Sequence, residues 1–352
     1  MDLTTGYPYW LIKDGLPFTY PSLSRSIKTE VAIIGGGISG ALMAYVLVQA
    51  GIGCTLVDAR SIGLGSTCAS TSLLQYELDK PLHELSAQIG WKQAMQAYQK
   101  CALSIDFLQQ ISEKIKFTSF QKQKSLYFAA GAQDKKKIET EFRYRKKAGL
   151  NVQLLGPKEI HREFNFSAPA AILSSKAAAT DAYLFAHALL QSSMKKGLQV
   201  YDRTKVVKLD YHPKHVILHT ENKCVIHARY VVNASGYEIK EFLQKKIVQL
   251  QSTYAFASEQ VKVDAPLWKG NSLLWNTANP YLYMRMTDDG RAIVGGRDEP
   301  YYNPEKRDRL IKQKTKQLRN DFLKIFPKIS VQPEYSWTGT FGITKDSLPY
   351  IG

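Results

Sequence analysis

The stretch that decides the fold runs from residue 29 to residue 58 and opens with Thr29-Glu-Val-Ala-Ile-Ile-Gly-Gly-Gly-Ile-Ser-Gly40. It predicts a strand over residues 30–34, a glycine turn, a helix over residues 38–50, and a second strand over residues 54–57 that ends on Asp58. A bare G-x-G-x-x-G is a weak signal. Strand, turn, helix, strand and acid in this order are what a dinucleotide-binding unit requires.

Each glycine of this turn has a mechanical task. Gly35 makes the tight turn, Gly37 lets the backbone approach a pyrophosphate, and Gly40 lets the helix pack closely on the strand. The start of the helix offers free N–H groups and a positive dipole end to that pyrophosphate. Asp58 lies where a carboxylate accepts hydrogen bonds from the ribose hydroxyls of the adenosine. The sequence therefore predicts a dinucleotide site.

The bulk properties narrow the class of protein. A chain of 352 residues with 44% hydrophobic residues is long and apolar enough for two folded domains. It has no run of 18 apolar residues, so we expect no membrane span. The net charge is +16, but the lysine runs lack interleaved aromatic residues, so we expect a solvated surface and no nucleic-acid partner. Zinc and disulfide frameworks are poorly supported and a cytoplasmic location is expected, because the cysteines have no C-x-x-C spacing: Cys54, Cys68, Cys101 and Cys224.

The remaining chain alternates between helical and strand patterns. We expect an α/β protein with a Rossmann-like, discontinuous nucleotide-binding domain and an interleaved α+β substrate domain built on an antiparallel sheet. The expected boundaries are 27–85, 150–240 and 333–352 for the first domain, 86–149 and 241–332 for the second, and 1–26 for an N-terminal arm.

Three later segments favour a flavin over a nicotinamide. The loop Gly65-Ser-Thr-Cys-Ala-Ser-Thr-Ser72 is small and polar, so its backbone could lie along a phosphate or a ring edge. Thr204-Lys-Val206 opens a strand whose main chain could read an adenine edge, and Val231-Val-Asn-Ala-Ser-Gly236 ends a strand in small residues. An NAD(P)-dependent dehydrogenase, with Arg60 as a 2′-phosphate contact, is the alternative.

With the blocks at residues 73–79, 280–296 and 337–352, these motifs resemble the D-amino-acid oxidase and glycine oxidase (DAO) family of FAD-dependent oxidoreductases. The resemblance covers the chain from about residue 29 to its last residue. It implies bound FAD, an amine or amino-acid-like substrate, and oxidation of a C–N bond by hydride transfer to flavin N5. Oxygen or another acceptor would then take the electrons.

The residues implied to contact FAD lie in the glycine turn, after the second strand and in the three later segments. Cys68 lies among them, where we expect a small buried filler rather than a covalent attachment point. The implied FAD contacts are Gly35, Gly37, Ile38, Ser39, Gly40, Asp58, Ala59, Arg60, Gly65, Ser66, Thr67, Ser70, Thr71, Val206, Ala234, Ser235 and Gly236.

The chain departs from the family pattern in two places. Family members that bind amino acids place an Arg shortly after the Trp-x-Gly segment to clamp the substrate carboxylate, and Phe341 stands there in this chain. A phenyl ring cannot replace a bidentate guanidinium, so we expect weak or no activity on plain D-amino acids. Family members also continue into a glycine-rich turn and a helix, so we expect this chain to lack that C-terminal segment. A truncated or degenerate flavin-binding protein without activity is therefore an alternative.

Tyr281, Tyr283 and Arg285 alternate along a predicted strand and so share one face. Tyr281 falls where D-amino-acid oxidases place a substrate-contacting tyrosine, and Arg285 could supply an anion handle. Alternatively, Arg285 pairs with Asp288 or Asp289, and Tyr283 fills the core.

For the other candidate residues, structural roles are favoured over functional ones. Glu259 and Tyr254 lie on a strand of the substrate domain, and packing or surface roles outweigh contact with the flavin. Four histidines of a strand meander lack acidic or cysteine partners at ligand spacing, so we expect a surface group and no metal site. They are His212, His215, His219 and His227.

Overall fold

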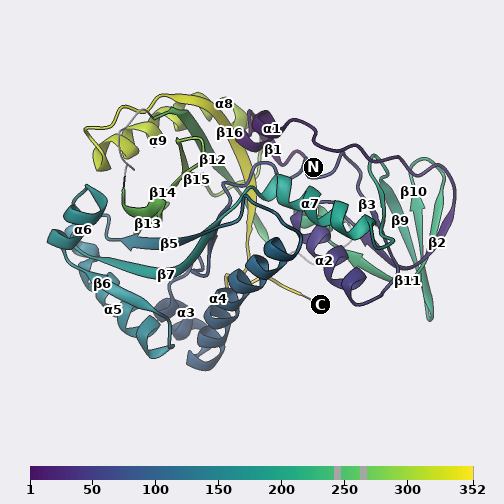
Figure 1. The fold of residues 1–352 in the computed structure, drawn as a ribbon, viewed down its shortest axis with the longest axis horizontal. Coiled ribbons are helices and arrows are strands. Elements are labelled where there is room, and N and C mark those ends of the chain that lie inside the picture. Colours follow the sequence, from purple (N-terminus) through teal and green to yellow (C-terminus); the bar gives the residue numbers. More distant parts are fainter. Residues whose placement is uncertain (242–246, 262–267, 352) are drawn as a thin grey trace. The chain divides into compact units, whose positions relative to one another are not determined.

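The computed structural model describes residues 1–241, 247–261 and 268–351. The chain divides into two compact units. Unit 1 comprises Met1–Thr4, Pro8–Ser70 and Asp181–Lys246, and unit 2 comprises Thr5–Tyr7, Thr71–Thr180 and Ile247–Gly352. Each unit has its own sheet and its own covering helices, which are labelled in Figure 1.

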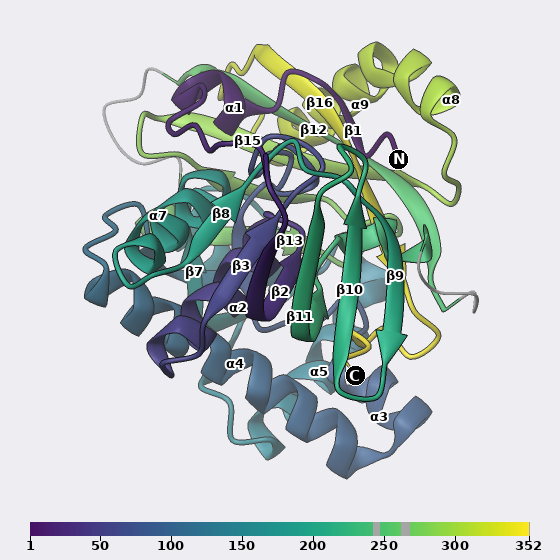
Figure 2. The same cartoon turned by 90° about the vertical axis from the view of Figure 1, so that its right-hand side faces the viewer.

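Unit 1 contains a six-stranded sheet in the order β8-β3-β2-β11-β10-β9, which Figure 2 shows across its face. The first four strands are parallel, and β10 runs antiparallel to both of its neighbours. Ile34 pairs with both Val57 and Asn233, so three parallel strands end at one edge of the sheet. The strands are β2 (Ile27–Ile34), β3 (Cys54–Val57), β8 (Gln199–Tyr201), β9 (Val206–His212), β10 (His215–Thr220) and β11 (Val225–Asn233).

Two helices of unit 1, α2 (Ile38–Gln49) and α7 (Ala182–Met194), pack against each other, and α2 also packs on β2 and β3. The last four residues of β2 and all of β3 are buried, as expected for central parallel strands that are apolar on both faces. The side chain of Asp181 caps α7 by accepting from the Leu184 N–H at 2.9 Å. A short helix, α1 (Tyr9–Asp14), and the chain after it complete the unit.

Unit 2 contains a ten-stranded, mostly antiparallel sheet in the order β1-β16-β12-β15-β14-β13-β5-β7-β4, with β6 paired to β7. Strands β13 and β5 of this sheet pair in parallel. Its strands are β1 (Thr4–Gly6), β4 (Leu73–Gln75), β5 (Gln121–Phe128), β6 (Val152–Leu155), β7 (Ala171–Ala179), β12 (Gln249–Gln260), β13 (Leu273–Asn276), β14 (Tyr283–Met286), β15 (Arg291–Glu299) and β16 (Pro333–Ile343). Its α-helices are α3 (Leu82–Ile89), α4 (Trp91–Lys114), α5 (Lys135–Lys147), α6 (Pro157–Phe164), α8 (Pro304–Arg309) and α9 (Ile311–Ile325).

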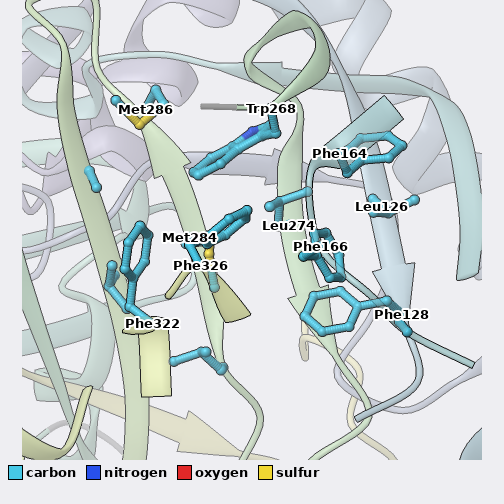
Figure 3. Close-up of a cluster of buried hydrophobic side chains, with 14 of the residues drawn as sticks. Leu126, Phe128, Phe164, Phe166, Trp268, Leu274, Met284, Met286, Phe322 and Phe326 are labelled. Carbon is cyan, nitrogen blue, oxygen red and sulfur yellow. The ribbon is translucent and has the colours of Figure 1, made fainter. Parts of the chain in front are cut away.

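The largest core of unit 2 is rich in aromatic residues and is shown in Figure 3. Trp268 stacks on Phe326 with ring centroids 5.2 Å apart. Helix α9 packs here against β12 and β15, so the face of β12 that carries Tyr254 and Phe256 is buried. Because strand side chains alternate, Thr253 lies on the opposite face of β12. That opposite face does not contribute to the core under α9.

The predicted fold class is confirmed: one sheet is mainly parallel and the other is mixed and largely antiparallel. The division of the chain differs from the predicted boundaries. Residues 150–180 and 333–351 belong with unit 2, because β6, β7 and β16 pair within its sheet. The expected arm is also divided, since β1 pairs with β16 while all of residues 8–26 belong to unit 1. Within the described ranges, no helix is long and apolar enough to cross a membrane.

Candidate cofactor and substrate sites

The glycine turn of unit 1 is packed so tightly that it has no room for side chains. A Cβ on Gly40 would lie 1.9 Å from the carbonyl oxygen of Gly35, and a Cβ on Gly35 would lie 2.4 Å from that of Ala234. Gly35 also has a φ of +111°, which side-chain-bearing residues rarely adopt. The turn, the start of α2 and the end of β11 therefore meet through their backbones.

The start of α2 lies against the small polar loop that follows β3. Gly37 is the N-cap and offers no side chain, and the Ile38 N–H donates to Thr67 Oγ1 at 3.0 Å. A Cβ on Gly37 would lie 2.9 Å from the same oxygen. The first turn of α2 contains no acidic residue, so the positive end of its dipole is left for an anion. Thr67 therefore fixes the loop to the helix start.

Asp58 ends β3 beside the glycine turn. Its Oδ2 accepts from the Gly36 N–H at 2.6 Å and its Oδ1 from the Arg60 N–H at 2.7 Å. Burial raises the pKa of this carboxyl, and the two N–H donors act against that rise. Each carboxylate oxygen has a second lone pair, so the group can still accept from ribose hydroxyls. The Thr204 N–H donates to the Asp58 carbonyl at 2.7 Å, which brings in the strand that Val206 begins.

Arg60 forms a bidentate ion pair with Glu238 that the sequence analysis did not predict. Its guanidinium donates to both carboxylate oxygens of Glu238, with Nη1–Oε1 at 2.9 Å and Nη2–Oε2 at 2.5 Å. Glu238 lies in a 3-10 helix, η2 (Gly236–Glu241), directly after the Ala234-Ser-Gly segment. A carboxylate at this position disfavours a 2′-phosphate, which weighs against the NADP alternative.

The residues of unit 1 fit the nucleotide of a flavin cofactor. The glycine cradle would be filled by any Cβ, the helix start lacks a counter-charge, and Asp58 has acceptor capacity to spare. Cys68 is buried and donates to the Gly65 carbonyl at 3.3 Å, and burial raises its pKa to about 11, so the thiol is not ionised at neutral pH. The predicted contacts in unit 1 are Gly35, Gly37, Ile38, Ser39, Gly40, Asp58, Ala59, Arg60, Gly65, Ser66, Thr67, Ser70, Val206, Ala234, Ser235 and Gly236.

The last predicted contact, Thr71, begins a segment of unit 2 and leads to the candidate substrate residues. The next residue, Ser72, accepts through its carbonyl from Arg285 of β14 at 3.0 Å. The Thr71 side chain lies close enough to Tyr283 of β14 to act against the rise that burial gives the pKa of that phenol.

Tyr283 pairs with Gly295, and a Cβ on Gly295 would lie 2.4 Å from the tyrosine ring. The ring therefore lies over the sheet at Gly295. Tyr283 packs against a second hydrophobic cluster that includes Tyr127 and Trp275, and not in the core under α9, so its expected packing role has support.

The register places further residues on the same face of the sheet. Gly295 pairs with Ala255, and the alternate residues Thr253 and Gln251 of β12 pair with Gly339 and Phe341 of β16. Directly paired residues project to the same side of a sheet. We call this surface, which carries Gln251, Thr253, Tyr283, Gly295, Gly339 and Phe341, the β12–β16 face.

The tyrosine hydroxyls beside this face remain protonated. Tyr281 donates to Asp79 Oδ1 at 2.8 Å, and burial together with the Asp79 charge raises its pKa well above the ordinary value. Burial, with the nearby Asp298 charge, also raises the pKa of Tyr283. Both phenols are therefore neutral hydrogen-bonding groups.

Arg285 has partners that differ from both sequence-based interpretations. It is buried, and its guanidinium donates to three backbone carbonyls: Met286 at 3.2 Å, Ser72 at 3.0 Å and Thr180 at 2.8 Å. The chain passes between the two units at 70/71 and 180/181, directly beside two of these carbonyls. The contacts support a structural role, and the anion handle stays a prediction without support from them. Asp289 pairs with Arg291 at 2.8 Å.

The remaining candidates have structural surroundings. Tyr254 lies in the core under α9, and its hydroxyl donates to the Arg307 carbonyl at 3.3 Å, whereas Glu259 is exposed. His219 is paired with Asp210 at 2.8 Å. In the described part of the chain, no group of three or more His, Cys, Asp or Glu is placed to hold a metal ion.

The fold and the glycine turn define a dinucleotide-binding protein with a Rossmann-like unit. A model of the DAO family, described as FAD dependent oxidoreductase, matches residues 30–352, so the chain belongs to that family. FAD is the cofactor that membership implies. The match extends to residue 352 and gives no support to the expected loss of a C-terminal family segment.

Individual proteins are more distantly similar. A putative Rieske 2Fe-2S iron-sulfur protein, YhfW of Bacillus subtilis, is 24% identical over 230 residues, which is 65% of this chain but 44% of that longer protein. Gamma-glutamylputrescine oxidoreductase of Escherichia coli is 20% identical over 95% of this chain and 78% of its own length. The crystal structure of L-proline dehydrogenase from P. horikoshii has a TM-score of 0.75 at 20% identity, covering 93% of this chain and 85% of that one. The structural likeness shows the shared fold.

Proposed function

We propose that the protein oxidises a C–N bond of an amine or amino-acid-like substrate, with FAD held by unit 1 and the substrate held on the β12–β16 face of unit 2. The observation that carries this proposal is the hydrogen bond from Arg285 of β14 to the Ser72 carbonyl at 3.0 Å. It joins the end of the predicted flavin loop to the strand that carries Tyr283, a candidate substrate residue. Two of the proteins that the chain resembles are named for the nitrogen compounds γ-glutamylputrescine and L-proline, which supports a nitrogen-bearing substrate.

Unit 1 supplies binding and orientation for the cofactor. The backbone of the glycine turn and the N-terminus of α2 would hold the pyrophosphate, and Asp58 would accept from the ribose. The loop from Gly65 to Thr71 would run beside the flavin ring. When bound, FAD supplies the acceptor for a hydride that leaves the substrate carbon.

Unit 2 supplies a surface with directed hydroxyl groups. The neutral phenols of Tyr281 and Tyr283 can donate to or accept from a substrate without adding charge. Gly295 and Gly339 add no side chains of their own to this face. Phe341 gives it an apolar edge where an amino-acid-binding family member would carry a cationic clamp, so the face has no guanidinium there for an α-carboxylate.

The test is the colour of the purified protein. After reconstitution with FAD, amines, D-amino acids and glycine derivatives are added one at a time without oxygen, and the visible flavin band is followed. We expect bleaching by at least one amine, with colour restored by oxygen or by an artificial electron acceptor. A protein that binds FAD stoichiometrically and is bleached by none of these compounds would instead support the non-catalytic, flavin-binding alternative.

A further inference from the structure

An irregularity in the sheet alters the β12–β16 face at one carboxylate. Ser252 pairs with Glu299 and Tyr254 with Gly296, so two residues of β15, Arg297 and Asp298, oppose the single residue Thr253. This is a β-bulge, and Arg297 has the positive φ of +58° that such a kink can require. Bulges re-aim side chains beside functional sites. Here the bulge places Asp298 opposite Thr253, whose side chain acts against the rise that burial gives the pKa of the carboxyl.

One oxygen of Asp298 has no visible partner. Its Oδ1 is buried, yet it has no hydrogen-bond partner among the residues that the structure describes. A buried acceptor without a donor destabilises a fold, and a charged one does so most strongly, so such atoms in native proteins call for an explanation. A donor from a ligand would satisfy this oxygen.

The surroundings of Asp298 favour a cationic donor. Burial, with the nearby Asp79 charge, raises its pKa to about 6, so the carboxylate is mostly ionised at neutral pH and would be stabilised by added positive charge. Lys314, whose charge acts against this rise in the pKa of Asp298, is already engaged: its amino group donates to the Arg297 carbonyl at 3.0 Å and to the carboxylate of Glu299. The tyrosine phenols beside Asp298 are neutral.

We propose that Asp298 is a specificity-determining residue that binds a protonated amino group of the substrate. The preferred substrates are then cationic amines without a carboxylate on the carbon that bears the nitrogen. This inference rests on the proposed function and names the substrate class of the same face. An α-carboxylate would be repelled by Asp298 and would find no cationic clamp at Phe341.

The expected size of the effect follows from the hydrogen bond that is lost. A hydrogen bond to a charged group in a desolvated site changes affinity by about ten- to hundredfold. We therefore expect Asp298→Asn to weaken amine binding by about that factor. Asp298→Glu keeps the charge, so it should retain part of the binding.

The experiment uses two compounds that differ by one group: n-butylamine, and norvaline, which is butylamine with a carboxylate on the nitrogen-bearing carbon. Binding to the FAD-loaded protein is followed by the change in the flavin spectrum without oxygen, and binding to the protein with or without FAD is followed by thermal stabilisation. The variants are Asp298→Asn and Asp298→Glu. Asp288→Asn is the matched control, because Asp288 is an exposed carboxylate in the turn between β14 and β15.

We expect butylamine to bind the wild type more tightly than norvaline does, and Asp298→Asn alone to remove that preference while FAD content and unfolding temperature stay near the control. Norvaline binding as tightly as butylamine would overturn the inference. So would an unchanged preference in Asp298→Asn, which would mean that an ordinary water satisfies Oδ1. If amines bind but no compound bleaches the flavin, the result supports amine binding by Asp298 and counts against the proposed oxidation. A failure of the binding proposal can therefore be distinguished from a failure of the proposed function.

Discussion

Replacing Gly40 by alanine should disrupt the cofactor cradle, and the magnitude follows from one distance. The new Cβ would lie 1.9 Å from the Gly35 carbonyl oxygen, whereas real Cβ contacts are essentially never under 3.0 Å, so 3.0 − 1.9 = 1.1 Å of separation must be gained. The atom that must move is backbone, and Gly35 is itself packed on Ala234. Forced shifts of packed groups destabilise by about 1–3 kcal/mol. We expect a loss of that size in the free energy of unfolding.

The same displacement should weaken FAD binding. The turn and the start of α2 would no longer hold their N–H groups in position for the pyrophosphate, and losing one hydrogen bond to a charged group corresponds to about a ten- to hundredfold weaker affinity. The assay is titration of FAD into apoprotein, followed by flavin fluorescence, with denaturant unfolding in parallel.

Gly53→Ala is the matched control for this substitution. It lies just before β3, where an added Cβ has no neighbour within 4 Å and no positive φ is imposed. We expect it to change stability by less than about 0.5 kcal/mol and to leave FAD affinity unchanged. A Gly40→Ala protein that matches Gly53→Ala in both measurements would refute the reasoning about the turn.

Three further predictions concern other parts of the chain. Asp58→Ala should weaken FAD binding by about ten- to hundredfold in the same titration, because it removes the acceptor for the ribose and for two backbone N–H groups. Arg285→Met should lower the free energy of unfolding by about 2–4 kcal/mol, since buried carbonyls lose their donor, whereas an anion handle would change KM and leave stability intact. For Glu141, burial alone would raise the pKa, but Arg145 and hydrogen bonds hold it at about 2, below its unfolded value of 4.5. That stabilisation, roughly 3 kcal/mol, is therefore present above pH 4.5 and is lost as the pH falls through 2, so the urea stabilities of the wild type and Glu141→Gln should converge in acid.

The helix and strands of the nucleotide-binding unit could be predicted from the sequence, because the residues that determine them are close together in the chain. The predicted helix at 38–50 is observed as Ile38–Gln49, and the predicted strand at 30–34 is observed as Ile27–Ile34. A glycine turn forces the chain from strand to helix within a few residues, so neighbours in sequence are also neighbours in space.

The residues of the candidate substrate face could be predicted from the sequence only in part, because their placement depends on the register of the strands. Tyr281 was identified, but its partner Asp79 is 202 residues away in the chain. The pairing of Thr253 with Gly339 and of Gln251 with Phe341 is a property of the folded sheet that one sequence does not display.

Of two missed residues, one left a trace in the sequence. Gly295-Gly296 ends two residues before Asp298, and paired glycines inside a strand are typical of a bulge. Glu238 lies two residues after Gly236 and opposes Arg60 across 178 positions, a separation that no local pattern bridges. Arg285 was read as a site residue because Tyr281, Tyr283 and Arg285 alternate. An alternating pattern does not show whether the Arg285 side chain binds a ligand or donates to backbone carbonyls of the protein.

Reduction of the bound flavin by an amine in a single turnover tests the central claim most directly. Wild-type protein loaded with FAD is mixed rapidly with butylamine in the absence of oxygen, and the visible band is followed in time. The account predicts bleaching at a rate that saturates with amine concentration and slows when the carbon bearing the nitrogen is deuterated. A flavin that is bound and yet stays oxidised with every amine and amino acid in the panel would contradict it.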